Sequence, residues 1–452
     1  MATRATSALA GSFAGELLAP GDGGYDDARQ VWNGAIDRRP ALIARCSGVA
    51  DVVAALRHAR EHDLLVAVRG GGHGVAGQAV CDDGIVIDLS PMRGIEVDPT
   101  GRTARAQGGV LWGELDAATQ EHGLATVGGI VTHTGIAGLT LGGGIGWLMR
   151  RHGATVDNLL AAEVVTARGD VLRASADEHP DLFWGLRGGG GNFGVVTSFE
   201  YRVHEVGPIV LSGPIFYALE DGPEVLRFYR ELIAEAPDEL TTIVNLRRAP
   251  ALPFVPAELH GRPVVAAIVC YAGAVQRGEQ VLAPLRRFGR PLLDAIAPRP
   301  YVELQQLFNP GVPHGWHYYW KSWELPPLSD GAIDTLVEHA ARITSPRSYV
   351  IVFSSAAPSR GWASTRPPTA SATRRTTSTS APCGFPTTRR ATSTPAGRAS
   401  ATRRSSRTPP AARTSTSSPR KAGTACAQPT ARSATRGSWR SSAPTTPATS
   451  CA

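Results

Sequence analysis

The sequence has no run of 18 or more apolar residues, so we expect no membrane-spanning helix. Near the N-terminus the apolar stretches are broken by Gly and Glu, which is not typical of a secretory signal, and we predict a cytoplasmic protein. The chain of 452 residues has only six cysteines, with no Cys-x-x-Cys pair and no histidine at zinc-ligand spacing. This pattern argues against a disulfide framework and against a metal site.

Acidic residues are absent from Pro358 to the C-terminus, although this segment contains 16 of the 46 Lys and Arg residues. The preceding part of the chain is therefore acidic, and the net charge of +7 is due to the tail. From Gly361 onward the sequence also has no Leu, Ile, Val, Met, Tyr, Asn or His. One interpretation is a disordered basic tail that binds nucleic acid or membranes.

A second interpretation is that the tail is translated out of frame. Except for Phe385, Lys421 and Gln428, its residues from Gly361 onward are types whose codons can carry G or C at the middle base. In a GC-rich gene, a shift of one base moves the third codon position into the middle position, and the final "APTTPATSCA" can then be read as "AYDPGNVL". We therefore predict a frameshift near Arg360, a disordered or misfolded tail, and no nucleic-acid or membrane partner.

The length of 452 residues exceeds that of one ordinary domain, and the density of glycine falls near residue 207. Before this point an amphipathic helix over 48–65 and short strands lie between glycine-rich loops; after it, helices such as 223–236 alternate with strands such as 263–273. We predict an α+β protein with an N-terminal segment (1–36), a first domain (37–206), a second α+β domain (207–359) and the tail (360–452).

A glycine loop with the sequence "AVRGGGHGVAG" follows a short apolar strand and contains His73. Consecutive residues without side chains let their backbone N–H groups point into one concavity, which suits a phosphate or diphosphate. A neutral imidazole, with a reference pKa of about 6.5, is also a competent nucleophile. A second segment, "RGGGGNFG", matches G-x-G-x-x-G, but it follows a helix and precedes a strand, whereas a Rossmann loop needs the reverse order.

Three segments carry a resemblance to a known family: "RGGGHG", "VGGIVTHTGIAGLTLGGGIGWLMRRHGATVDNL" and "DLFWGLRGGGGNFGVVT", in this order. They resemble the FAD-linked oxidases that include berberine bridge enzyme, the hexose and oligosaccharide oxidases and 6-hydroxy-D-nicotine oxidase. The similarity extends over about residues 17–355. It implies that the first domain is a PCMH-type FAD-binding domain of two small α/β subdomains, and that the antiparallel sheet of a substrate domain covers the flavin.

The resemblance also implies how the cofactor is held. His73 falls on the histidine that the family joins to the 8-methyl carbon of the flavin. Many members add a second link through a cysteine, but Val131 occupies that position here and cannot form a thioether, so we expect covalent FAD through His73 only. The other expected FAD-binding positions are Arg69, Gly70, Gly71, Gly72, Gly74, Gly77, Gly128, Gly129, Thr132, Thr134, Gly135, Gly138, Gly142, Gly143, Gly144, Gly146, Asp157, Asn158, Gly194 and Val195.

Two positions are implied in catalysis. Thr134 falls where the family controls access of oxygen to the flavin. Lys321, in "GWHYYWKSWEL", falls on an aromatic-Lys/Arg-Ser segment near the family's substrate pocket, and the alternative is an aromatic core strand with a solvated lysine.

The predicted function is that of an FAD-dependent oxidase, which transfers a hydride from a C–H bond of an alcohol, amine or sugar to FAD and uses molecular oxygen as electron acceptor. The alternatives are a flavin dehydrogenase or reductase that excludes oxygen, and an inactive product of the frameshift. The catalytic base and the oligomeric state are left open.

Overall fold

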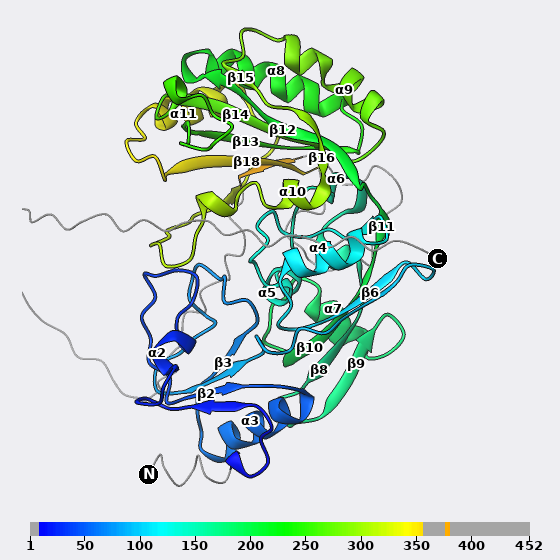
Figure 1. Cartoon of the computed structure of the whole chain (residues 1–452), viewed down its shortest axis with the longest axis vertical. Coiled ribbons are helices and arrows are strands. Elements are labelled where there is room, and N and C mark those ends of the chain that lie inside the picture. Colours follow the sequence, from blue (N-terminus) through cyan, green and yellow to red (C-terminus); the bar gives the residue numbers. More distant parts are fainter. Residues whose placement is uncertain (1–8, 356–375, 380–452) are drawn as a thin grey trace, which may run out of the picture. The chain divides into compact units, whose positions relative to one another are not determined.

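The computed structural model of the protein describes residues 9–355 and the strand over 376–379 (Figure 1). At the N-terminal end is a four-stranded sheet in the order β1-β2-β4-β3. Its strands β2 (Leu42–Arg45), β4 (Ile85–Asp88) and β3 (Val66–Arg69) are parallel, and β1 (Glu16–Leu18) is antiparallel to β2. The predicted amphipathic helix is present as α3 (Val49–Glu61), which connects β2 to β3 and buries Val52, Ala55 and Leu56.

A five-stranded antiparallel sheet follows, in the order β5-β6-β10-β8-β9. The strands are β5 (Ile95–Asp98), β6 (Thr103–Gln107), β8 (Leu159–Val165), β9 (Val171–Ser175) and β10 (Val195–Arg202). The core of this part contains Trp112, Leu115 and Phe199, all fully buried. Its connecting elements are α4 (Trp112–Gln120), α5 (Ile136–Leu141), α6 (Met149–His152), η1 (Thr155–Asp157) and α7 (Pro180–Leu186).

Three short elements complete the N-terminal half. They are α2 (Tyr25–Ala28), and β7 (Leu124–Ala125), which pairs with β11 (His204–Glu205).

The chain then enters an eight-stranded antiparallel sheet. Its strands are β12 (Ile209–Ala218), β13 (Leu240–Arg248), β14 (Pro263–Tyr271), β15 (Leu293–Asp294), β16 (Ala297–Pro300), β17 (Trp323–Glu324), β18 (Tyr349–Ser355) and β19 (Thr376–Thr379). The helical elements of this part are η2 (Leu219–Asp221), α8 (Gly222–Glu235), η3 (Ala257–Leu259), α9 (Val275–Arg287), α10 (Tyr301–Gln305), η4 (Asn309–Gly311) and α11 (Asp330–Ala341).

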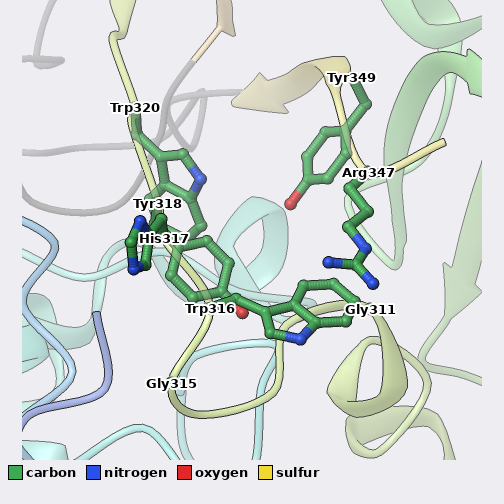
Figure 2. Close-up of a pocket in the computed structure, with 8 residues that line it drawn as sticks. All are labelled: Gly311, Gly315, Trp316, His317, Tyr318, Trp320, Arg347 and Tyr349. Carbon is green, nitrogen blue, oxygen red and sulfur yellow. The ribbon is translucent and has the colours of Figure 1, made fainter. Parts of the chain in front are cut away.

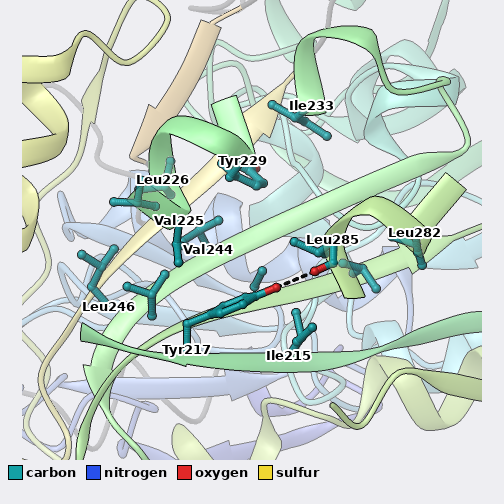
Figure 3. Packing of buried hydrophobic residues seen from close by; sticks show 14 of the residues in the cluster. Ile215, Tyr217, Val225, Leu226, Tyr229, Ile233, Val244, Leu246, Leu282 and Leu285 are labelled. Carbon is teal, nitrogen blue, oxygen red and sulfur yellow. Dashed lines mark hydrogen bonds between the residues drawn. The ribbon is translucent and has the colours of Figure 1, made fainter. Parts of the chain in front are cut away.

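The two faces of this sheet are buried by different elements, because successive strand residues point to opposite sides. On one face Ile215 and Val244 pack with residues of α8, α9 and α11, and the Tyr217 hydroxyl donates to the Leu285 carbonyl at 2.6 Å (Figure 3). On the other face Phe216 and Ile243 pack with α10 and with residues of the N-terminal half. The sheet is thus placed with one face toward the glycine loops.

The predicted α+β fold, with an antiparallel sheet in the second domain, is confirmed for the described residues. The predicted domain boundaries stay predictions. The predicted disorder of the tail concerns residues outside the described ranges, apart from the four residues of β19. None of the helices in the described part of the chain has both the length and the apolar character needed to cross a membrane.

Candidate functional site

The glycine loop begins where β3 ends, and its residues are small because two stretches of backbone meet there. A Cβ atom on Gly71 would lie 2.4 Å from the backbone nitrogen of Gly135, and one on Gly70 would lie 2.8 Å from the carbonyl oxygen of Gly108. Gly72 has a φ of +66°, a conformation that side chains disfavour. The local sequence is therefore dictated by close backbone contact.

The backbone N–H groups of this loop are available to a ligand. Within the described residues, no N–H group from Gly70 to Gly74 donates a hydrogen bond to another protein group. Buried backbone donors are paired almost everywhere in folded proteins, and Gly72 is buried, so this run of donors can serve an acceptor that the protein does not itself supply. Such a nest of N–H groups suits phosphate oxygens.

The other glycine-rich segments converge on this loop. Gly135 contacts Gly71, and a Cβ atom on Gly146 would lie 1.7 Å from the carbonyl oxygen of Gly128. The backbone of Gly144 accepts a hydrogen bond from the N–H of Thr155 at 3.0 Å. The structure thus brings segments 70–74, 128–135 and 142–146 together.

His73 lies at the end of the nest and is held by aromatic rings. Its imidazole stacks on Trp32 with ring centroids 4.1 Å apart, and the other face of Trp32 stacks on Tyr318 at 3.6 Å. The Nε2 atom of His73 lies 3.2 Å from Nδ1 of His133, whose ring centroid is 4.9 Å from that of His314. Three histidines therefore gather beside the glycine loop.

The environment keeps these imidazoles uncharged. Burial, with smaller contributions from His133 and His314, lowers the pKa of His73 to about 3. Burial and His314 lower the pKa of His133 to about 4. Since both values lie far below neutrality, His73 has a free ring lone pair at pH 7 and can act as a nucleophile. Among the described residues, no group of His, Cys, Asp or Glu has the arrangement of a metal site.

A cavity of about 390 Å³ lies beyond Tyr318 (Figure 2). It is lined by Gly311, Gly315, Trp316, His317, Tyr318, Trp320, Arg347 and Tyr349. Residues from the N-terminal part of the chain fix this segment: the Trp32 indole donates to the Val312 carbonyl at 2.9 Å, and Gly34 N–H donates to the Trp316 carbonyl at 2.9 Å. The cavity is therefore attached directly to the ring that stacks on His73.

Comparison with known proteins agrees with this site. A family profile described as an FAD binding domain matches residues 40–175. The (R)-6-hydroxynicotine oxidase of Paenarthrobacter nicotinovorans is 37% identical over 313 residues, which cover 68% of this chain and 66% of that protein. An FAD-linked oxidoreductase of Dictyostelium discoideum is 33% identical over 321 residues, which cover 70% of this chain and 67% of that protein. The chain belongs to the FAD-linked oxidoreductase family.

Solved structures of similar proteins have the same fold. The 6-hydroxy-D-nicotine oxidase of Arthrobacter nicotinovorans matches with a TM-score of 0.69 at 34% identity, over 76% of each chain. A glucooligosaccharide oxidase of Acremonium strictum, which carries a 6-S-cysteinyl, 8α-N1-histidyl FAD, matches with a TM-score of 0.66 at 23% identity, over 77% of this chain and 74% of that one. This oxidoreductase spans about two thirds of the length of the curated relatives.

The residues of this FAD-linked oxidoreductase fit the cofactor. The unpaired N–H groups of Gly70–Gly74 match a diphosphate, and the close glycine contacts leave the loop free of side chains. Thr132 and Thr134 lie on the adjoining loop, where Thr132 N–H donates to Asn309 Oδ1 at 3.1 Å and the Thr134 carbonyl accepts from Trp112 N–H at 2.9 Å.

Other predicted FAD positions make protein contacts with their side chains. The Arg69 guanidinium donates to the carbonyls of Ala28 and Gln30 and lies beside Asp88. These contacts connect the start of the glycine loop to the segment around α2. Asp157 accepts from Ala154 N–H at 2.7 Å, and Asn158 donates to the carbonyls of His152 and Ala154. These side chains stabilise the segments on which they lie, and FAD contact through them stays a prediction.

Gly194 and Val195 are placed at the start of β10. A Cβ atom on Gly194 would lie 2.6 Å from the carbonyl of Val165, so the glycine is needed for strand packing. The remaining predicted positions are in the three converging segments or next to them: Gly77 follows the nest, and Gly138, Gly142 and Gly143 lie in and after α5.

The structure does not bring Lys321 into the cavity. Its side chain is exposed, with Nζ 5.3 Å from the centre of the Tyr319 ring. Along this extended segment Trp316, Tyr318 and Trp320 are partly buried and line the cavity, whereas the odd-numbered positions from 317 to 321 are exposed, and of these only His317 borders the cavity. Lys321 is therefore not among the residues that line this cavity, and its catalytic role stays a prediction.

Several residues of the site were missed by sequence reasoning. Trp32 and Arg347 carry no local signal, since their roles arise from contacts with distant segments. His133 lies inside a recognised glycine-rich segment, between Thr132 and Thr134, and its proximity to another glycine-flanked histidine was an available signal.

Proposed function

We propose that this FAD-linked oxidoreductase is an oxidase whose FAD is joined covalently to His73 alone, that acts on a C–H bond of an alcohol, amine or sugar, and that uses molecular oxygen as electron acceptor. The observation that carries the proposal is a partly buried, neutral imidazole within a run of five unpaired backbone N–H groups. When bound, FAD supplies an acceptor for the substrate hydride and a donor of two electrons to oxygen, which becomes hydrogen peroxide.

The single covalent link is supported by two residues. His73 is held by Trp32 on one ring face and by His133 at Nε2, so its orientation is defined before any cofactor binds. Val131 is in the loop next to His133 and has no thiol, whereas the Acremonium oxidase carries both a cysteinyl and a histidyl link. The residues present therefore support a histidyl link without a cysteinyl link.

The chain's own residues then have separate tasks. The nest of Gly70–Gly74 binds the diphosphate, and the Trp32 ring keeps the imidazole in place. The loop that holds Thr134 is fixed through its backbone, since Thr134 N–H donates to the Val131 carbonyl at 3.1 Å. A rigid loop at this position controls which small molecules reach the ring system of the cofactor.

The test is acid precipitation of the purified full-length protein. We expect the yellow colour to stay with the denatured protein, and a His73→Ala variant to release its FAD into the supernatant. His122→Ala, an exposed histidine far from the glycine loop in sequence, is the matched control and should keep the colour. Complete release of FAD by the unmodified protein would refute the link, and turnover in air without peroxide would refute the oxidase assignment.

A further inference from the structure

The cavity beyond Tyr318 has an aromatic wall and a cationic rim. Figure 2 shows Trp320 and Tyr318 on one side, Tyr349 and Arg347 on the other, and Trp316 next to Arg347. Its volume of about 390 Å³ is within the range of small-molecule sites. Four of the eight lining residues are aromatic and none is acidic, so the cavity offers flat apolar surface together with positive charge.

Two arginines approach this cavity without a carboxylate partner. The Cζ atom of Arg347 lies 3.7 Å from the centre of the Trp316 ring, and Cζ of Arg247 lies 5.2 Å from the centre of the Tyr349 ring. Among the described residues, no Asp or Glu forms an ion pair with either guanidinium. A guanidinium stacked on an indole still has its in-plane N–H groups available, and these match a carboxylate.

We propose that the cavity binds a planar aromatic carboxylate, with its ring among Trp316, Tyr318 and Trp320 and its anionic group at Arg347 and the Tyr349 hydroxyl. This adds a recognition element, an aromatic carboxylate beside the oxidised C–H bond, to the substrate of the oxidase proposed above, and it rests on that function. An ammonium substrate is disfavoured, because the lining offers it no carboxylate and places Arg347 against it.

Two further observations support the proposal. Burial raises the pKa of Tyr349, so its phenol is neutral and can donate a hydrogen bond to an anion. The Tyr318 hydroxyl instead donates to the Pro313 carbonyl, which fixes the Tyr318 ring in the wall of the cavity. The cavity also adjoins the cofactor site, since Tyr318 stacks on Trp32 and Trp32 stacks on His73. A ring bound against Tyr318 is therefore close to the residue that would hold FAD.

The experiment compares three ligands of one shape and different charge: benzoate, benzamide and benzamidinium. Each is titrated calorimetrically into the full-length, FAD-containing protein, and the visible flavin spectrum is recorded in parallel. We expect benzoate to bind roughly tenfold or more tightly than benzamide, benzamidinium to bind most weakly, and benzoate to shift the flavin band. Because this comparison uses the unmodified protein, it does not depend on the folding of a variant.

The variant Arg347→Gln then tests whether the carboxylate of benzoate binds at Arg347. This variant should lower the affinity for benzoate to about that for benzamide and leave benzamide unchanged. The matched control is Arg342→Gln, which removes a guanidinium paired with Glu338 on the exposed face of α11 and should change neither affinity.

Three results would overturn the proposal: benzamidinium binding as tightly as benzoate, equal losses of both affinities in Arg347→Gln, or benzoate binding without any flavin shift. Each of these three results would be obtained with protein that contains FAD. A protein that contains no FAD would instead refute the proposed function, so the two failures are distinguishable.

Discussion

Gly71→Ala is the sharpest test of the nest. The added Cβ atom would lie 2.4 Å from the nitrogen and 2.6 Å from the Cα of Gly135, and 3.1 Å from a methyl group of Leu111. The first two contacts are with backbone atoms on a loop that is itself hydrogen-bonded, since Trp112 N–H donates to the Thr134 carbonyl. No side-chain rotation relieves them, so one of the two loops must move.

The cost follows from this geometry. Overpacking a well-packed site costs about 1–3 kcal/mol, and a contact between two backbones is at the upper end of this range. For a folded unit of this size, a loss of about 3 kcal/mol lowers the melting temperature by roughly 4 °C. The displaced loop also separates the N–H groups of Gly70–Gly74, so FAD should be retained poorly.

The assay is thermal unfolding followed by circular dichroism, together with the flavin absorbance that remains after gel filtration. Gly74→Ala is the matched control, because it is the same substitution in the same loop and no heavy atom lies within 4 Å of its added Cβ. Its melting temperature should stay within about 2 °C of the unmodified protein, as for a surface substitution. If Gly71→Ala and Gly74→Ala have the same melting temperature and both keep FAD, the close packing of the two loops is refuted.

Three further predictions address other parts of the structure. Burial lowers the pKa of His204 from 6.5 to about 4, so the unfolded state binds the proton first and stability is lost as the pH falls from 6.5 toward 4. His204→Gln should make the melting temperature depend less steeply on pH in this interval, and an unchanged pH dependence would contradict the reasoning. Burial raises the pKa of Asp116 from 3.8 to about 7, so the contribution of this carboxyl group to stability is present below pH 3.8 and is lost as the pH rises through 7. The melting temperature of Asp116→Asn should therefore rise relative to that of the unmodified protein over this interval. A difference in melting temperature that does not change with pH would refute the shift. Trp32→Ala should cost about 3–5 kcal/mol in denaturant unfolding, whereas Trp184→Ala, at a side chain with 49% exposure, should cost about 0.5 kcal/mol or less; equal costs would contradict the stacking role of Trp32.

Much of the fold could be predicted from local patterns. Helix α3 follows from apolar residues at helical spacing, and the β8–β9 pair follows from two apolar strands around Gly169, which has a φ of +92°. The glycine loop after β3 was also predicted, because a run of three glycines after a strand has few other structural uses. These features depend on hydrogen bonds and sterics within a few residues.

The side chains that line the cavity could not be predicted in the same way. The aromatic segment was recognised from composition, but composition did not show that Trp316, His317, Tyr318 and Trp320 line the cavity and that Lys321 does not. Which face of an extended segment is buried depends on its partner, and here the partner is Asn33, whose side chain pairs with the backbone of Tyr318 across 285 residues. Composition contains no information about such a pairing.

The sequence by itself determined the local elements, the glycine nest and the position of His73 within it, because these depend on the steric freedom of neighbouring residues. Only the tertiary structure decided that Trp32 stands between His73 and Tyr318, that His133 meets His73, and that Arg347 stacks on Trp316. Contacts of this kind join segments far apart in the chain. They form because the free energy gained by packing the whole domain exceeds the loss of chain entropy when those segments are brought together.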